Sequence, residues 1–80
     1  MELRTILHTA NIDAYQKVLL MYLLDAQKNG REWVWFEDIV SAMGVSGKCF
    51  REKANLLIDS RWIVKGRRGY YSLNKFPTLF

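Results

Sequence analysis

The side chains of this chain that could do chemistry are mainly cationic, and they lie in its second half. Residues 45–80 carry eight basic and two acidic side chains, a net charge of +6, whereas residues 1–44 carry four basic and six acidic ones, a net charge of −2. Charge gathered in one half costs self-repulsion and favours binding to a polyanion, whereas scattered charge indicates only a soluble surface. The basic residues of this half are Lys48, Arg51, Lys53, Arg61, Lys65, Arg67, Arg68 and Lys75.

Three polar residues of this half have the spacing of one helix face. Lys48, Arg51 and Asn55 stand at positions i, i+3 and i+7, and Glu52 lies beside them. Arginine pairs with guanine and asparagine with adenine through two hydrogen bonds, each pairing contributing ~1–3 kcal/mol of discrimination between bases. We predict that Arg51 reads a base and that Lys48 contacts a base or a phosphate. An ordinary solvated helix face is the alternative.

A second basic group stands between two predicted strands, at 63–65 and 70–73. It is the segment Lys65-Gly66-Arg67-Arg68-Gly69, here called the basic loop. Basic hairpin loops commonly contact phosphates or enter a minor groove. Positive charge can also protect a sheet edge from pairing, but two adjacent arginines exceed what that purpose needs.

The residue types give no support for catalysis or metal binding. His8 is the single histidine and Cys49 the single cysteine, so neither an intrachain disulfide nor a zinc site is expected. No nucleophile–base set, paired carboxylates or glycine-rich phosphate loop is recognisable. We predict that the protein is not an enzyme and uses no cofactor. Cys49 is interpreted as a small packed residue, with a redox switch as the alternative.

Length and composition are typical of one small globular domain. The chain has 80 residues, of which 50% are hydrophobic and 25% charged, which suits one modest core and argues against disorder. The longest apolar run, at 18–24, is far shorter than a membrane span. No signal-peptide pattern is present at the N-terminus, so a cytoplasmic protein is expected.

Hydrophobic periodicity predicts two helices in the first half. Apolar residues recur at helical spacing in 1–10, with an edge strand as the alternative. Asp13 and Gln16 form a capping-box pattern at the start of the next helix, and Gly30 marks its end. That helix is expected to bury one stripe, made of Tyr15, Val18, Leu19, Tyr22, Leu23 and Ala26.

Aromatic and β-branched residues at 33–36 predict a short strand. Trp33 and Trp35 would share one side of it. They are interpreted as core or dimer contacts, with stacking on unpaired bases as the alternative. The pair Tyr70-Tyr71 is expected to support the core and the basic loop.

Two helices joined by a tight turn follow the predicted strand. The first, at 36–43, carries an apolar stripe, and the turn is Gly44-Val45-Ser46. Ser46 is a suitable N-cap for the second helix, which carries Lys48 and Arg51 on its outer face. This is a helix-turn-helix arrangement. The inner face of the second helix is expected to be Phe50, Ala54, Leu57 and Ile58.

The segment FEDIVSAMGVSGKCFREKANLLIDSRWIVKGRRGYYSL, residues 36–73, resembles the winged-helix domains of prokaryotic and phage regulators. With the helix and strand before it, the resemblance covers residues 13–73. It implies an α+β winged helix-turn-helix fold, with a three-helix core and a small antiparallel β-hairpin as the wing. Residues 1–12 would be an amphipathic N-terminal segment and residues 74–80 an apolar tail of the same single domain.

Two positions stand out against this resemblance. Members of the family commonly end the recognition helix with glycine, where this chain has Arg61. A non-glycine residue at positive φ is uncommon, so either the helix ends differently or Arg61 points toward the DNA backbone. Gly47, at the first helical position, lowers helix propensity and would let its amide approach a phosphate.

The resemblance implies sequence-specific binding of double-stranded DNA, by a small transcriptional regulator or a phage or plasmid control protein. The recognition helix would enter the major groove, and the wing would lie on the backbone or in the minor groove. A protein-interaction module or inhibitor is the main alternative, and a replication or recombination accessory protein is another. The predicted DNA-binding residues are Ser46, Gly47, Lys48, Arg51, Asn55, Arg61, Lys65, Arg67 and Arg68.

A homodimer is expected, because helix-turn-helix proteins usually occupy two half-sites. Apolar residues near both ends of the chain are expected to lie outside the winged-helix core and to form the contact. They are Leu3, Ile6, Leu7, Phe76, Leu79 and Phe80.

Overall fold

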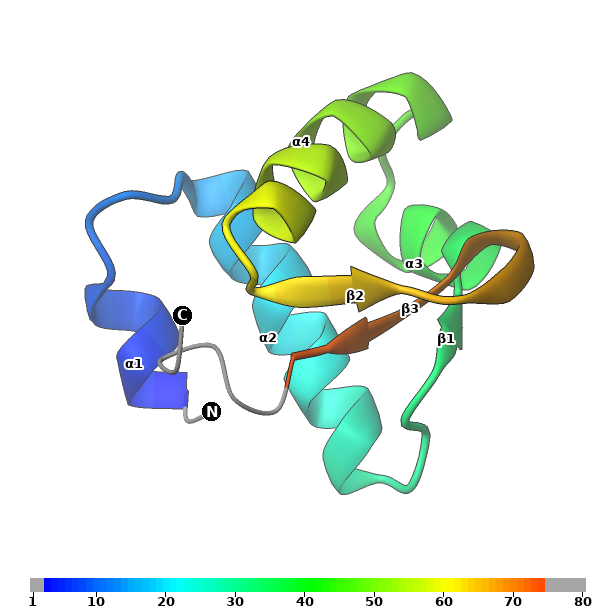
Figure 1. Ribbon diagram of the computed structural model, residues 1–80, viewed down its shortest axis with the longest axis horizontal. Coiled ribbons are helices and arrows are strands. Elements are labelled where there is room, and N and C mark those ends of the chain that lie inside the picture. The colour runs from blue at the N-terminus through cyan, green and yellow to red at the C-terminus, as the bar shows by residue number, and fades with distance from the viewer. Residues whose placement is uncertain (1–2, 75–80) are drawn as a thin grey trace.

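The computed structural model describes residues 3–74, which form a small α+β domain with four α-helices and a three-stranded antiparallel sheet (Figure 1). The strand order is β1-β3-β2, so the last strand is the central one. The elements are α1 (Leu3–His8), α2 (Ala14–Lys28), β1 (Val34–Trp35), α3 (Phe36–Met43), α4 (Gly47–Asp59), β2 (Ile63–Lys65), the 3₁₀ turn η1 (Arg67–Gly69) and β3 (Tyr70–Leu73).

The core lies between the helices and one face of the sheet. Phe50 of α4 is completely buried, and its ring meets the ring of Tyr71 on β3 edge-on, at 5.2 Å between centroids. Helix α2 contacts α1, α3, α4 and β3, so it is the element around which the others pack. The predicted inner face of α4 is confirmed, since Phe50, Ala54 and Leu57 are buried and Ile58 packs against the core.

The buried face of α2 differs from the predicted stripe. Val18 is 46% exposed, whereas Leu20 and Leu24, outside the stripe, are 0% and 6% exposed. Helix α2 has neighbours on several sides, namely α1, α3, α4 and β3. Such a helix buries more than one stripe, and Leu20 and Leu24 are therefore buried as well.

The N-terminal segment is a helix, as predicted, and the edge-strand alternative is wrong. The expectation that all its apolar residues lie outside the core is wrong for Ile6, which joins the core cluster. Leu3 and Leu7 are 45% and 48% exposed. The tail at 76–80 lies outside the described residues, so the homodimer stays a prediction.

The predicted strand at 33–36 is shorter than expected. Only Val34 and Trp35 are in β1, where they pair with Tyr71 and Tyr70, and Phe36 is already the first residue of α3. Trp33 is 46% exposed and is therefore not a core residue of this domain. The two hairpin strands, at 63–65 and 70–73, are confirmed at both ends.

The turn between α3 and α4 is the predicted one. Helix α3 ends at Met43, and Gly44 takes the left-handed conformation with φ of 68°. The Ser46 hydroxyl accepts a hydrogen bond from the Cys49 amide at 3.2 Å, which satisfies one of the free amides in the first turn of α4.

The end of α4 shows how the chain accommodates Arg61. This residue itself adopts the left-handed conformation, with φ of 66°. The Arg61 amide donates to the Ile58 carbonyl at 3.0 Å, and the Trp62 amide donates to the Leu57 carbonyl at 2.9 Å. These two bonds are the Schellman motif that usually has glycine at this position. The helix therefore ends in the usual way, at a conformational cost of roughly 1–2 kcal/mol for a residue with a Cβ.

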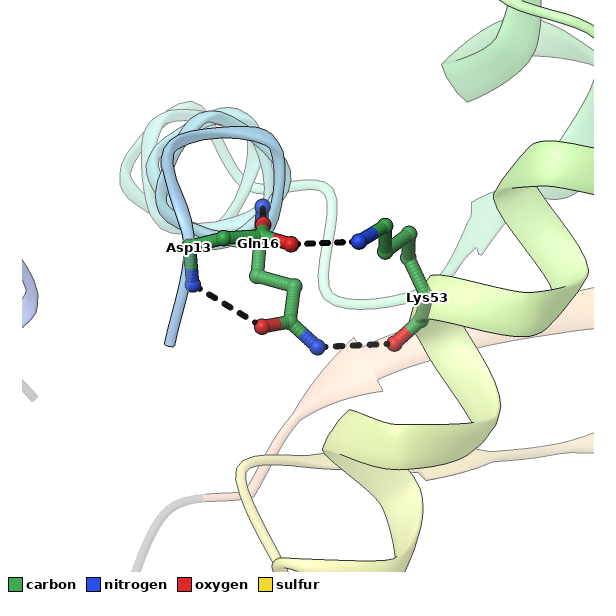
Figure 2. A network of polar contacts seen from close by, with 3 residues as sticks. All are labelled: Asp13, Gln16 and Lys53. Atoms are coloured by element: carbon green, nitrogen blue, oxygen red, sulfur yellow. Dashed lines mark hydrogen bonds and ion pairs between the residues drawn. The ribbon is translucent and has the colours of Figure 1, made fainter. Parts of the chain in front are cut away.

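A polar network fixes α4 against the start of α2 (Figure 2). The Asp13 carboxylate accepts the Gln16 amide at 2.8 Å, and the Gln16 side chain accepts the Asp13 amide at 3.0 Å, which confirms the capping box. The Lys53 ammonium donates to Asp13, and the Gln16 side chain donates to the Lys53 carbonyl at 3.4 Å. The charge of Lys53 is thus paired within the domain.

This network predicts a stability change in acid. The Lys53 hydrogen bond, followed by the Gln16 amide, lowers the pKa of Asp13 below its ordinary value of 3.8. A carboxylate with a lowered folded-state pKa stabilises the fold above its ordinary pKa, and this contribution is lost as pH falls through the lowered value. Thermal unfolding between about pH 5 and about pH 2.5 is therefore expected to show a smaller loss of Tm for Asp13→Asn than for wild type.

Asp59→Asn, at an exposed position on α4, is the matched control and should keep the wild-type loss of Tm. Equal acid sensitivity of Asp13→Asn and wild type would contradict the stabilising role of the network.

Candidate nucleic-acid interface

The basic loop joins β2 to β3 and contains the short turn η1. The Gly66 amide donates to the Tyr70 carbonyl at 2.7 Å, which closes the loop. Arg68 and Gly69 both have positive φ, of 51° and 85°, so the chain turns sharply at its tip. Arg67 and Arg68 are exposed, and the loop therefore presents two guanidinium groups to solvent.

Aromatic rings hold both glycines of the basic loop, a contact that the sequence pattern does not reveal. A Cβ at Gly66 would lie 2.7 Å from the Trp33 ring, and a Cβ at Gly69 would lie 2.9 Å from the Phe36 ring. Such distances are too short for real atoms, so each ring occupies the space that a side chain would need. These glycines allow close aromatic packing as well as the bend.

Phe36 links the basic loop to α4. The Arg51 guanidinium carbon lies 5.9 Å from the centroid of the Phe36 ring, and the same ring packs on Gly69. A guanidinium over an aromatic face contributes about 0.5–1 kcal/mol at an exposed site. Arg51 is therefore held on the side of α4 that carries Phe36, and the same ring contacts the basic loop at Gly69.

The outer face of α4 is positive at one end only. Lys48, Arg51 and Asn55 are all exposed, as predicted. Glu52 and Asp59 are exposed as well, and positions 48, 52, 55 and 59 follow one line along the helix. Asn55 thus lies between two carboxylates, and the cationic side chains of this face, Lys48 and Arg51, both precede them along the helix.

The first residues of α4 add backbone groups to this positive end. The amides of a first helical turn carry partial positive charge and attract anions. A Cβ at Gly47 would meet nothing within 4 Å, so packing inside the domain does not require glycine there.

Cys49 lies close to Tyr15. Burial, and then the neighbouring thiol, raises the pKa of Tyr15 to about 12, which agrees with a packing role for Cys49.

One predicted site residue is separated from the rest. Arg61 lies beyond the C-terminal end of α4, and β2 runs between it and the basic loop (Figure 1). Asn55 lies one helical turn beyond Arg51 on the exposed face of α4. The structure brings together the other eight residues, on two neighbouring segments: Ser46, Gly47, Lys48, Arg51 and Asn55 on α4, and Lys65, Arg67 and Arg68 in the basic loop.

A hollow beside the basic loop was not expected from the sequence. It has a volume of about 430 Å³ and is lined by Trp33, Gly66, Arg67 and Tyr70.

The side chains of Tyr70 and Tyr71 lie on opposite faces of the sheet. Tyr71 is 4% exposed, in the core, and Tyr70 is 41% exposed on the other face. The alternation of side chains along a strand is the signal that could have separated the two tyrosines.

Within residues 3–74 no cluster of three or more histidine, cysteine, aspartate or glutamate side chains is arranged to hold a metal ion. None of the helices in the same part of the chain is long and apolar enough to cross a membrane. No protein-family model, curated protein or solved structure matches this chain.

Proposed function

We propose that this chain is a winged-helix domain that binds double-stranded DNA sequence-specifically, as a small regulator or a phage or plasmid control protein. The order of elements from α2 to β3 and the strand order β1-β3-β2 are compatible with that fold. In this proposal α4 is the recognition helix and the basic loop is the wing.

The contact of Phe36 with both Arg51 and Gly69 carries the proposal. Through this one ring the positive end of α4 and the basic loop are linked, which supports the proposal that their cationic side chains bind DNA together. In helix-turn-helix complexes the N-terminal residues of the recognition helix contact base edges. The carboxylate of Asp59 supports the same orientation, because it would keep the C-terminal end of α4 away from the phosphates.

The proposed roles of the arginines follow from their positions in the fold. Arg51 is on the exposed helix and can reach a base edge in the major groove. Arg67 and Arg68, at the tip of a hairpin, are suited to phosphates or to a minor groove. Arg61, at the far end of α4, is outside this surface.

A protein-interaction role is the second candidate, and one observation favours it. Leu56 of α4 is 55% exposed and lies near the acidic side chains of Glu52 and Asp59. An exposed leucine on a mixed-charge helix face suits a protein partner better than a phosphate backbone. If this candidate were correct, Leu56→Ala would abolish capture of a partner and leave any DNA binding unchanged.

Two sets of substitutions test the DNA proposal. Arg51→Ala is expected to lose discrimination at one base position, by ~1–3 kcal/mol, whereas Arg67→Ala with Arg68→Ala should weaken binding to all duplexes alike. Gel shifts against a selected site and its single-base variants measure both effects.

Arg61→Ala is the matched control, because it removes the same charge at the other end of α4, and it should leave the base preference unchanged. If Arg51→Ala weakened every sequence equally, Arg51 would be a phosphate contact and not a base reader.

A further inference from the structure

The hollow beside the basic loop is a preformed aromatic surface. Trp33 and Tyr70 are 46% and 41% exposed, and both line the hollow together with Gly66 and Arg67. The Trp33 ring rests on Gly66, where a Cβ would lie 2.7 Å away. The Tyr70 ring contacts the ring of Trp35, its partner on the adjacent strand, with centroids 5.2 Å apart. The two exposed rings are thus held in place by the protein itself.

The hollow joins this aromatic surface to positive charge. Arg67 is one of its lining residues, and Lys65 and Arg68 are its exposed neighbours in the basic loop. No acidic side chain is among the residues that line it. An apolar ligand would not interact with the guanidinium group, and an inorganic anion would not interact with the aromatic rings. The complementary ligand is flat, aromatic and anionic.

We propose that this hollow binds an unpaired nucleobase of a DNA strand, with the base against Trp33 and Tyr70 and its phosphate on Arg67. This inference rests on the proposed DNA binding, since the basic loop would hold the neighbouring backbone. The volume of about 430 Å³ falls within the range of roughly 300–1,000 Å³ that small-molecule sites occupy.

The base must be unpaired because of how its faces are used. Inside a duplex each base is stacked on both faces and offers only its edges to the grooves. A ring platform can bind a base only when one face is free, as in a single strand, an overhang or a bulge. The protein is therefore expected to prefer duplex DNA that carries unpaired nucleotides next to the bound segment.

The test compares three DNA ligands by fluorescence anisotropy with the full chain. They are a blunt duplex, the same duplex with a short single-stranded overhang, and that duplex with an overhang of abasic nucleotides. The abasic overhang keeps the phosphates and removes the bases. Binding to the normal overhang is expected to be about tenfold tighter than to the blunt duplex, as one base–aromatic stack contributes, and the abasic overhang should lose this gain.

Substitutions of Trp33 test whether the hollow beside the basic loop is the surface that binds the unpaired base. Trp33→Ala should lose the overhang preference, measured as the ratio of overhang affinity to blunt-duplex affinity, whereas Trp33→Phe should retain most of this ratio because a ring remains. Val18→Ala is the matched control, since Val18 is 46% exposed on α2 and is not one of the residues that line the hollow. Stacking should also quench tryptophan fluorescence in wild type and not in Trp33→Phe.

The outcomes separate this inference from the function on which it rests. If wild type bound no blunt duplex at low salt, the proposed function would fail, and this inference with it. If wild type bound the blunt duplex but gained nothing from normal bases over abasic ones, only the nucleobase site would be overturned. An overhang preference that persisted in Trp33→Ala would likewise overturn the nucleobase site alone.

Discussion

Replacing Leu57 or Leu23 with alanine is expected to destabilise the domain by roughly 2–5 kcal/mol. Leu57 of α4 is 1% exposed and Leu23 of α2 is 2% exposed, and both belong to the same core cluster. Truncation removes buried methyl groups and leaves a cavity that the surrounding side chains fill only in part. A domain of this size has roughly 5–15 kcal/mol of stability in total, so either change removes a large share.

Urea unfolding followed by circular dichroism measures this effect. Leu56→Ala is the matched control, because it is the same chemical change at the neighbouring position, where the side chain is 55% exposed. It is expected to shift the free energy of unfolding by no more than about 0.5 kcal/mol. A large loss at Leu56 and none at Leu57 would mean that α4 presents the other face to the core.

Binding to duplex DNA is expected to weaken steeply with salt. Five cationic side chains on the proposed surface imply a log–log slope of about −4 to −5 per protomer. Between 50 and 200 mM salt this slope corresponds to a loss of affinity of roughly 250- to 1,000-fold. The five side chains are Lys48, Arg51, Lys65, Arg67 and Arg68.

Lys53 is not among these five side chains, because its ammonium donates to Asp13. Anisotropy titrations at several salt concentrations give the slope. Arg67→Ala with Arg68→Ala should reduce its size by about 2, and Arg61→Ala should leave it unchanged. A flat salt response in wild type would refute the DNA proposal, whatever the behaviour of the variants.

Local signals in the sequence identified most element boundaries. The capping box of Asp13 and Gln16, the Gly44 turn and the Ser46 cap each depend on residues within one turn of the chain, and all three are confirmed. The hairpin strands are confirmed for the same reason, since two short β-prone segments flank a glycine-containing loop. Such features form from neighbours in sequence, so a pattern of neighbours can predict them.

Features that depend on contacts between residues far apart in the sequence were either predicted wrongly or not predicted. Leu20 and Leu24 are buried and Val18 is exposed because α2 has neighbours on several sides, and nothing in the α2 stripe itself indicates those contacts. Arg61 has positive φ, and the Asn74 side chain, 13 residues further along the chain, donates to the Arg61 carbonyl at 2.8 Å and helps to hold this conformation. In this case packing and hydrogen bonding outweigh the conformational preference of a single residue.

The candidate site shows the same difference between local features and contacts distant in the sequence. The exposure of the cationic residues could be predicted from their type, because charge is seldom buried without a partner, and the spacing of Lys48 and Arg51 indicated the outside of a helix. The position of Phe36 between Arg51 and Gly69, and the hollow that Trp33 and Tyr70 share with Arg67, depend on the folded chain and could not be predicted in this way. These groups lie far apart in the chain, and the packing of α3 and the sheet brings them together.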